Sequence, residues 1–134
     1  MKSEEHRKAL QEHLTNLNKA IDENIEENQR NIGFNVSQAS VELFALYLHA
    51  LYFIEGSGDQ WDHRTFKNKK MLEQKVPFSF PEREKILPLM ETIERERLLI
   101  CYGKRKPKDR IEKMILAFRE LQEIINKNMP HEPK

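Results

Sequence analysis

The sequence predicts an all-α protein, folded as an up-and-down antiparallel four-helix bundle with a short extra helical segment between helices two and three. Three observations lead to this prediction. Of the 134 residues, 34% are charged, whereas only four are glycine and six are proline, a composition typical of helical proteins. Apolar residues recur at spacings of three, four and seven in four long stretches. Most of the turns between these stretches are short, which favours antiparallel neighbours.

The length and the charge bound the class of protein. A chain of this size is long enough for one domain with its own core, and we expect a single domain over 1–134, with its core at about 8–128 and a frayed tail at 129–134. The net charge of +1 gives no overall attraction to nucleic acid or to an anionic membrane, although a local patch could. No apolar run approaches the roughly 18 residues that span a bilayer. The charged N-terminus lacks the apolar core of a signal peptide. We therefore expect a cytoplasmic protein without membrane contact.

The first helix is expected from about Ser3 to Asn31, where Asn28, Asn31 and Gly33 form a stop signal. Its apolar stripe consists of Leu10, Leu14, Leu17, Ile21, Ile25 and Ile32. The stripe is narrow and the rest of the helix is polar. Such a helix is expected to pack along its length against partner helices.

The second helix is expected to begin at Asn35 or Ser37, which are both good N-cap residues, and to reach Gly56. From Val41 to Ile54 it is apolar nearly all round, which is typical of a central, buried helix. This apolar surface exceeds what one small bundle needs. The excess favours a homodimer that buries one face of the helix.

One stripe of the second helix is polar. Gln38, Glu42 and His49 fall within about 40° of each other at 100° per residue. The stripe is either the solvent side of an otherwise buried helix or a polar strip inside a cleft or dimer seam. In the second interpretation Glu42 or His49 takes part in chemistry, because carboxylate and imidazole groups act as acids and bases.

The helical periodicity is lost between Gly56 and Phe80. The stretch GSGDQWDHR is expected to be a loop, and RTFKNKKMLEQ is expected to form two short helical turns. Trp61 and His63 could stack on and bond to a nucleobase. We favour the interpretation in which Trp61 plugs the end of the bundle.

The third helix is expected to open at Ser79, with a kink near Pro88. Its core stripe consists of Ile86, Met90, Ile93, Arg97 and Ile100. Arg97 therefore occupies an apolar position, although charged groups normally avoid packed surfaces. Three interpretations are open: an arginine that snorkels at the bundle edge, a structural partner of a buried acid such as Glu42, and a site residue.

The last helix is expected from Asp109 to about Asn128, after Gly103 has capped the third. Its core stripe consists of Ile111, Met114, Ile115, Phe118, Leu121 and Ile125. Cations gather around the cap between the two helices, namely Arg95, Arg97, Lys104, Arg105, Lys106, Lys108 and Arg110. This cluster is the strongest local indication of a site in the sequence.

The sequence predicts no metal, no cofactor and no internal disulfide. Cys101 is the single cysteine, which excludes a CxxC zinc site. The five histidines have no metal-ligand spacing, and no core stripe carries the Glu-x-x-His of metal-binding bundles. Cys101 has no histidine near it in the sequence, so thiol catalysis lacks support.

The order of these segments resembles the HEPN superfamily, the helical domain of prokaryotic RNases and nucleotidyltransferase partners. A long first helix precedes the apolar stretch SQASVELFALYLHALYFIEG, a loop, a helix that ends in arginines and a closing amphipathic helix. The resemblance covers about residues 8–128. The catalytic signature of the family is an arginine, four to six residues and a histidine. Arg97 followed by LLIC fits this spacing, as does Arg95 with six residues, but Tyr102 takes the place of the histidine.

The resemblance implies a role for each of these residues. Arg97 would bind phosphate, whose oxygens match the guanidinium fork. Tyr102 would stand where the histidine of the family helps to activate the ribose 2′-hydroxyl, although a phenol is a poor general base at neutral pH. In a dimer the two motifs would meet across a groove, and Lys104 and Arg105 would widen its positive mouth.

We therefore expect a HEPN-like dimer associated with RNA or nucleotide binding, with or without the activity of a degenerate metal-independent ribonuclease. The expected catalytic residues are Arg97 and Tyr102, and the expected binding residues are Arg95, Lys104, Arg105, Glu42 and His49. The alternative is a non-catalytic helical interaction protein, for example the partner of a minimal nucleotidyltransferase. Arg97 and Tyr102 lie about 140° apart on an ideal helix, so they meet only if the helix end unwinds at Gly103 or a second subunit supplies one of them.

Overall fold

The computed structural model describes residues 2–54, 63–66 and 68–130, and the fold is all-α. The elements are α1 (Ser3–Glu23), α2 (Gln29–Ala50), the 3-10 turn η1 (His63–Phe66), α3 (Lys69–Lys75), α4 (Arg83–Cys101) and α5 (Lys108–Asn128). The described ranges contain no β-strand. No helix in them is long and apolar enough to cross a membrane.

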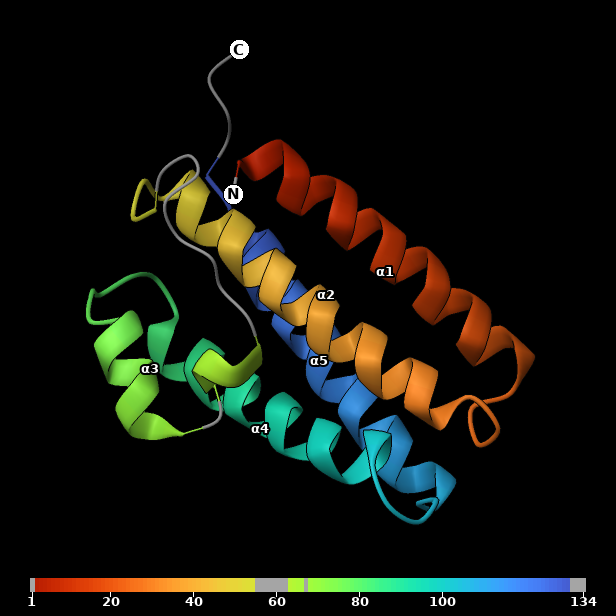
Figure 1. Cartoon of the computed structure of the whole chain (residues 1–134). Helices are drawn as coiled ribbons and strands as arrows, with labels where there is room; N and C mark the ends of the chain where they lie inside the picture. The colour runs from red at the N-terminus through yellow and green to blue at the C-terminus, as the bar shows by residue number, and fades with distance from the viewer. Residues whose placement is uncertain (1, 55–62, 67, 131–134) are drawn as a thin grey trace.

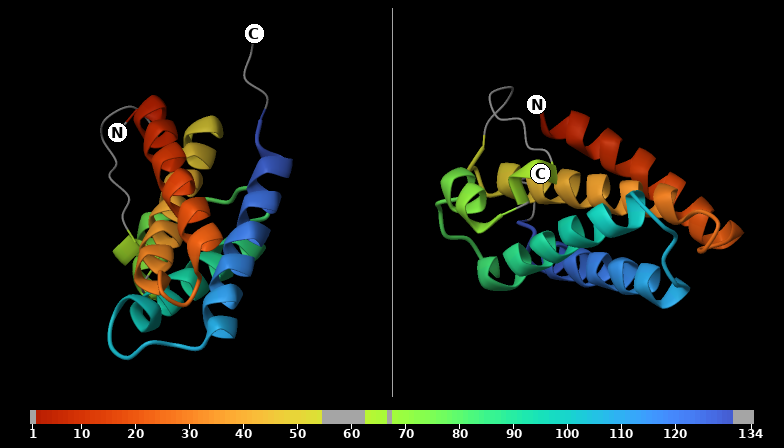
Figure 2. Two further views of the ribbon diagram at one scale, coloured as in Figure 1. Left: turned by 90° about the vertical axis from the view of Figure 1, so that its right-hand side faces the viewer. Right: turned by 60° about the horizontal axis from the view of Figure 1, so that its bottom comes forward.

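Helix α2 lies at the centre of the molecule (Figure 1). Helix α1 packs along one side of α2, while α4 and α5 pack on its other sides and against each other, as Figure 2 shows from two further directions. The turn η1 contacts α2, α3 and α4. Among the described elements, α1 contacts α2 alone. The helices α2, α4 and α5 therefore form a core to which α1 is added as an outer layer.

The central position expected for the apolar second helix is confirmed. Fully buried side chains of α2 are Ile32, Val36, Ala39, Phe44, Ala45, Tyr47 and Leu48, each with 0% exposure. At 100° per residue these side chains point in several directions around the helix. Most of the apolar surface that favoured a homodimer is therefore covered within one chain, whereas Tyr52 and Phe53 stay exposed.

The expected boundary between the first two helices is wrong. Helix α1 ends at Glu23, a turn occupies residues 24–28, and α2 already begins at Gln29. Asn31 and Gly33, whose residue types predict a helix stop, lie inside α2. The turn is closed by its own asparagines: the Asn24 Oδ1 accepts a hydrogen bond from the Glu27 backbone N–H at 3.0 Å.

Gly33 has a packing role instead of a capping role. A Cβ atom at this position would lie 2.9 Å from both Cys101 Sγ and Ile100 Cγ2 on α4. Such distances are too short for carbon in contact with sulfur or carbon. The absence of a side chain at Gly33 therefore allows α2 and the end of α4 to approach closely.

The ends of the other long helices also differ from the expectation. Helix α2 ends at Ala50 instead of Gly56, because Tyr52 adopts φ 64° and the Phe53 N–H bonds back to the Leu48 carbonyl at 2.9 Å. This is the Schellman pattern, here with tyrosine where glycine is usual. Helix α4 begins at Arg83 instead of Ser79.

The segment before α4 is folded back by Arg83. Its guanidinium donates from Nε to the Phe78 carbonyl at 3.1 Å and from Nη2 to the Val76 carbonyl at 3.0 Å. The Tyr47 hydroxyl on α2 donates to the Pro81 carbonyl at 3.0 Å. These bonds hold residues 76–82 in a non-helical conformation, so α4 begins only at Arg83.

Several sequence predictions are confirmed. The two short turns expected after residue 64 are η1 and α3, the last helix begins at Lys108 and ends at Asn128, and Gly103 at φ 79° follows the end of α4. The core stripe of α5 is buried as expected. The role expected for Trp61 lies outside the described residues, as does the side chain of His63.

Candidate functional site

Arg97 is buried, as its position in the core stripe of α4 predicts. Its side chain is 7% exposed, and its Nε and Nη1 atoms have no hydrogen-bond partner in the described part of the chain. The guanidinium carbon lies 5.8 Å from the ring centroid of Phe34 on α2, within cation–π range. Glu42, which was one possible structural partner, is bonded to another residue.

Cys101 lies one helical turn after Arg97 and is half-buried. Its thiol donates to the backbone carbonyl of Arg30 at 3.7 Å. Burial raises the pKa of the Cys101 thiol above its usual value, an effect that the Arg97 charge and hydrogen bond oppose and the Glu94 charge reinforces. The thiol is therefore neutral near pH 7, and a neutral thiol is a poor nucleophile.

The surroundings of Arg97 are polar on one side and aromatic on the other. Glu94 on the preceding turn is buried, with 4% exposure. Phe34 is 44% exposed and lies between two helices, because His13 of α1 contacts the same ring edge-on with centroids 5.9 Å apart. Phe34 therefore covers the guanidinium from the outside of the molecule.

Tyr102 does not join Arg97. The helix does end at Cys101, as a meeting of the two side chains would require, but Tyr102 continues in an extended backbone with φ −127° and ψ 152°. Its side chain is 61% exposed, whereas Arg97 is buried. Within one chain, the arginine and the tyrosine of the family-like spacing therefore point to different environments.

The expected binding cations are also separated from Arg97. Arg105 donates from Nη1 to the backbone carbonyls of Glu26 and Glu27, at 2.7 and 3.3 Å, so it ties the α4–α5 loop to the α1–α2 turn. Arg95 is exposed and donates to the Thr92 hydroxyl at 3.2 Å. Lys104 is exposed in the loop. The structure thus divides the cation cluster into a buried, a bridging and a solvated part.

Glu42 and His49 lie in the seam between α1 and α2. Glu42 Oε2 is 2.5 Å from Nδ1 of His6, whose ring is 1% exposed, and the rings of His6 and His49 have centroids 5.3 Å apart. The polar stripe of α2 therefore faces α1, and its interpretation as a solvent side is wrong. A hydrogen bond between an imidazole N–H and a carboxylate is charge-assisted because the acceptor is ionised.

His6 is not among the candidate residues that the sequence predicts. The signal that could have found it is its spacing, because it precedes Leu10 and Leu14 on the apolar stripe of the first helix by four and eight residues. A histidine on such a stripe is expected to be buried. Its partner, Glu42, lies on α2. Periodicity does not predict which turn of α2 packs against which turn of α1.

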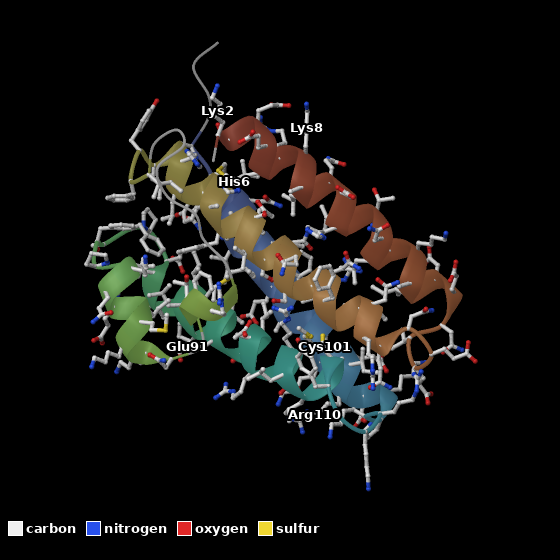
Figure 3. All side chains as sticks on the ribbon, viewed as in Figure 1. Lys2, His6, Lys8, Glu91, Cys101 and Arg110 are labelled. Carbon is white, nitrogen blue, oxygen red and sulfur yellow. The ribbon has the colours of Figure 1, made fainter. Side chains whose placement is uncertain are left out.

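The candidate residues lie in two separate parts of the molecule, one around Arg97 and one around Glu42 and His49. Glu42 follows Phe34 by eight residues on α2, which corresponds to about 12 Å along the helix. In Figure 3, His6 lies beside the far end of α2 from Cys101. The described residues include no group of three or more histidine, cysteine, aspartate or glutamate side chains arranged to hold a metal ion.

A cavity of about 510 Å³ lies in a third place, where the chain enters α4. It is lined by Pro77, Phe78, Ser79, Phe80, Glu82, Arg83, Glu84 and Lys85. Two guanidinium nitrogens of Arg83 already donate to backbone carbonyls, so these N–H groups stabilise the fold and are not free to bind a ligand. None of the expected site residues lines this cavity.

Comparison of the chain with protein-family models, with curated proteins and with solved structures gave no match in any of the three searches.

Proposed function

We propose that this chain is a HEPN-like four-helix bundle, formed by α1, α2, α4 and α5, that binds the phosphate of an RNA or a nucleotide at Arg97 without cleaving it. The observation that carries the proposal is the state of the Arg97 side chain. Its Nε and Nη1 atoms are buried without a partner in the described residues. A buried donor without a partner costs about 1–3 kcal/mol, and more when the group is charged.

A phosphate oxygen is the ligand that such a site lacks. Guanidinium N–H groups form short, charge-assisted hydrogen bonds to phosphate oxygens, often two in parallel. Low local polarity strengthens these bonds compared with bonds in water. Entry requires Phe34 to move, and its 44% exposure supports such a movement. A base or ribose would then lie against the displaced ring.

Binding without cleavage is supported by the states of the two residues that follow the end of the Arg97 stripe, Cys101 and Tyr102. Tyr102 points to solvent, and the Cys101 thiol is held in its neutral form by burial. Metal-independent cleavage needs a group within hydrogen-bond reach of the 2′-hydroxyl to accept its proton. The pair His6 and Glu42 is buried in another part of the molecule.

The test compares Arg97→Gln with Arg95→Gln, which removes an exposed cation from the same helix. The measurement is fluorescence anisotropy of a labelled single-stranded RNA, with ATP as competitor, at low salt. We expect Arg97→Gln to weaken binding about tenfold or more, since charge-assisted bonds contribute about 1.5–3 kcal/mol. Arg95→Gln should change it much less.

Circular dichroism first establishes that both variants are folded. Equal affinities of folded Arg97→Gln and wild type would contradict the proposal. The RNA is then recovered and its length analysed. Fragments with 2′,3′-cyclic phosphate ends that disappear in Arg97→Gln would replace the binding role by a ribonuclease role.

The second candidate function is a non-catalytic helical interaction protein, for example the partner of a minimal nucleotidyltransferase. One observation favours it: the outer face of α4 carries Leu98 at 43% and Leu99 at 37% exposure, next to the exposed Tyr102. Apolar side chains that gather at a surface are typical of interaction sites. Capture of one defined protein by wild type, but not by Leu98→Ser/Leu99→Ser, together with no RNA or nucleotide binding, would select this function.

A further inference from the structure

Helix α1 is attached to the rest of the molecule through one surface. It contacts α2 and no other described element. The side-chain hydrogen bonds described between the two helices join His6 to Glu42 at 2.5 Å and His13 to Asn35 at 3.0 Å. Leu17 and Ala20 complete the seam with buried apolar contacts. All these contacts are made by α1 and α2 side chains, so they form equally well when the two helices come from different chains.

The turn between α1 and α2 has the sequence of a helix. The segment NIEEN at residues 24–28 contains neither glycine nor proline, and the apolar spacing continues through Ile25. For this reason the sequence predicts one helix through residue 31. The break occurs at Asn24, which has an extended backbone with φ −177° and ψ 117°. Nothing in the residue types of the turn prevents it from becoming helical.

Two sets of bonds hold the turn in its bent form. Within the turn, the Asn24 side chain accepts from the Glu27 N–H at 3.0 Å, and the Asn28 side chain donates to the Asn24 carbonyl at 2.9 Å. From the α4–α5 loop, Arg105 donates to the carbonyls of Glu26 and Glu27. The bend is therefore stabilised by a few side-chain bonds that substitution can remove.

We propose that α1 exchanges between two copies of this chain. The turn straightens, α1 and α2 become one helix, and α1 of each copy packs against α2 of the other with the contacts seen here. Because α1 and α2 run antiparallel, two straightened helices that pair in this way are related by a two-fold axis at the turn, and exchange of an identical element is a low-cost route to such dimers. Arg105 acts as a clasp that favours the closed, single-copy form.

The exchange does not rest on the binding of phosphate at Arg97. Its free energy has two opposing parts. The closed form keeps the bonds of Asn24, Asn28 and Arg105, whereas the straight form gains backbone hydrogen bonds through the former turn. Dimer formation also depends on protein concentration by mass action.

The first experiment weakens the turn. In Asn24→Ala/Asn28→Ala the side-chain bonds are lost and helix propensity rises. The matched control is Asn16→Ala/Asn18→Ala, which replaces two exposed asparagines in the middle of α1. Size-exclusion chromatography with light scattering measures the dimer fraction over a concentration series. We expect about a tenfold or greater shift toward dimer for the turn variant, because each hydrogen bond contributes about 1 kcal/mol, and no shift for the control.

The clasp is tested separately with Arg105→Ala against Lys104→Ala, which removes the neighbouring exposed cation of the same loop. Neither substitution alters a helix, so both proteins are expected to fold. Arg105→Ala should raise the dimer fraction and Lys104→Ala should not. A turn variant and an Arg105→Ala variant that both stay monomeric at all concentrations would overturn the proposal.

The second experiment distinguishes exchange from ordinary dimerisation. His13 and Phe34, whose rings are in contact across the seam, are replaced by cysteine in a Cys101→Ser background, and a short bismaleimide links the two thiols. In the closed form the link joins residues of one chain. In an exchanged dimer it joins two chains, which denaturing gel electrophoresis detects as a covalent dimer. Dimers of the turn variant that carry only links within one chain would contradict the exchange.

Discussion

At the scale of the residue, Arg97 and Gly33 decide how α4 meets α2. Arg97 brings a charge into the core, and Gly33 removes a side chain where Ile100 and Cys101 need the space. The apolar period of the third helix predicts the burial of Arg97. The sequence does not predict the packing role of Gly33, because a glycine after a run of asparagines also has the pattern of a helix end.

Gly33→Ala is expected to destabilise the protein. Alanine favours a helix by about 1 kcal/mol over glycine, but a Cβ at 2.9 Å from two side-chain atoms of α4 forces α2 and α4 apart, at a cost of about 1–3 kcal/mol. Chemical denaturation measures the free energy of unfolding. Cys101→Ala in the same chain should recover part of the loss, since it removes one of the two atoms. Equal losses with and without Cys101→Ala would show that the sulfur is not the obstacle.

The Cys101 thiol is expected to make stability depend on alkaline pH. Burial raises its pKa, so the folded protein holds the thiol proton more tightly than the unfolded chain does. The resulting stability is present below the unfolded pKa and is lost as the pH rises through the raised folded pKa. Above roughly pH 8.5, the free energy of unfolding should therefore fall more steeply for wild type than for Cys101→Ala. A constant difference between the two proteins from neutral to alkaline pH would refute this account.

At the scale of the element, the seam between α1 and α2 combines polar and apolar contacts. The period of α1 predicts which side is buried, and the stripe with Glu42 and His49 is recognisable on α2. The pairing of His6 with Glu42 is not predictable, because it depends on the register between the two helices. That register is set by the turn at residues 24–28, and the sequence pattern runs through this turn as if it were helical.

Removal of one member of the His6–Glu42 pair is expected to be more damaging than removal of both. His6→Phe leaves the largely buried Glu42 carboxylate without its partner, which should cost about 1–3 kcal/mol. His6→Phe/Glu42→Leu replaces the pair by apolar groups and should recover much of the stability. A double-mutant cycle with the single variants measures the coupling energy. Additive losses would mean that the two side chains do not depend on each other.

At the scale of the whole molecule, composition and periodicity are sufficient for the all-α fold and for the central place of the apolar helix. They do not place α1, which contacts α2 alone, and they do not bring the candidate residues together. Three of the expected binding residues, Arg95, Lys104 and Arg105, are adjacent in sequence to Arg97 but point elsewhere. Arg95 lies about 160° from Arg97 around α4. Lys104 and Arg105 are separated from Arg97 by the end of α4, where one extended residue and Gly103 at φ 79° turn the chain away.

The loop that joins α4 to α5 also determines how the whole molecule is held together. Arg105 reaches the α1–α2 turn, Arg30 donates to the Gly103 carbonyl at 3.2 Å, and Arg110 binds Glu96 at 2.9 Å. Arg105 and Arg110, two cations of the stretch from Arg95 to Arg110, therefore stabilise the fold through bonds to other elements. Among the arginines of this stretch, Arg97 is the one that combines burial of its side chain with N–H donors that lack a partner among the described residues.

The most direct test of this central claim is an NMR titration that follows the Nε–H resonances of the arginines while ATP is added. We expect the Arg97 resonance, assigned by its loss in Arg97→Gln, to shift and to saturate, with Arg95 and Arg105 nearly unchanged. If the Arg97 resonance stays in place at saturating nucleotide, or if all arginines shift together without saturation, Arg97 is not a phosphate-binding residue.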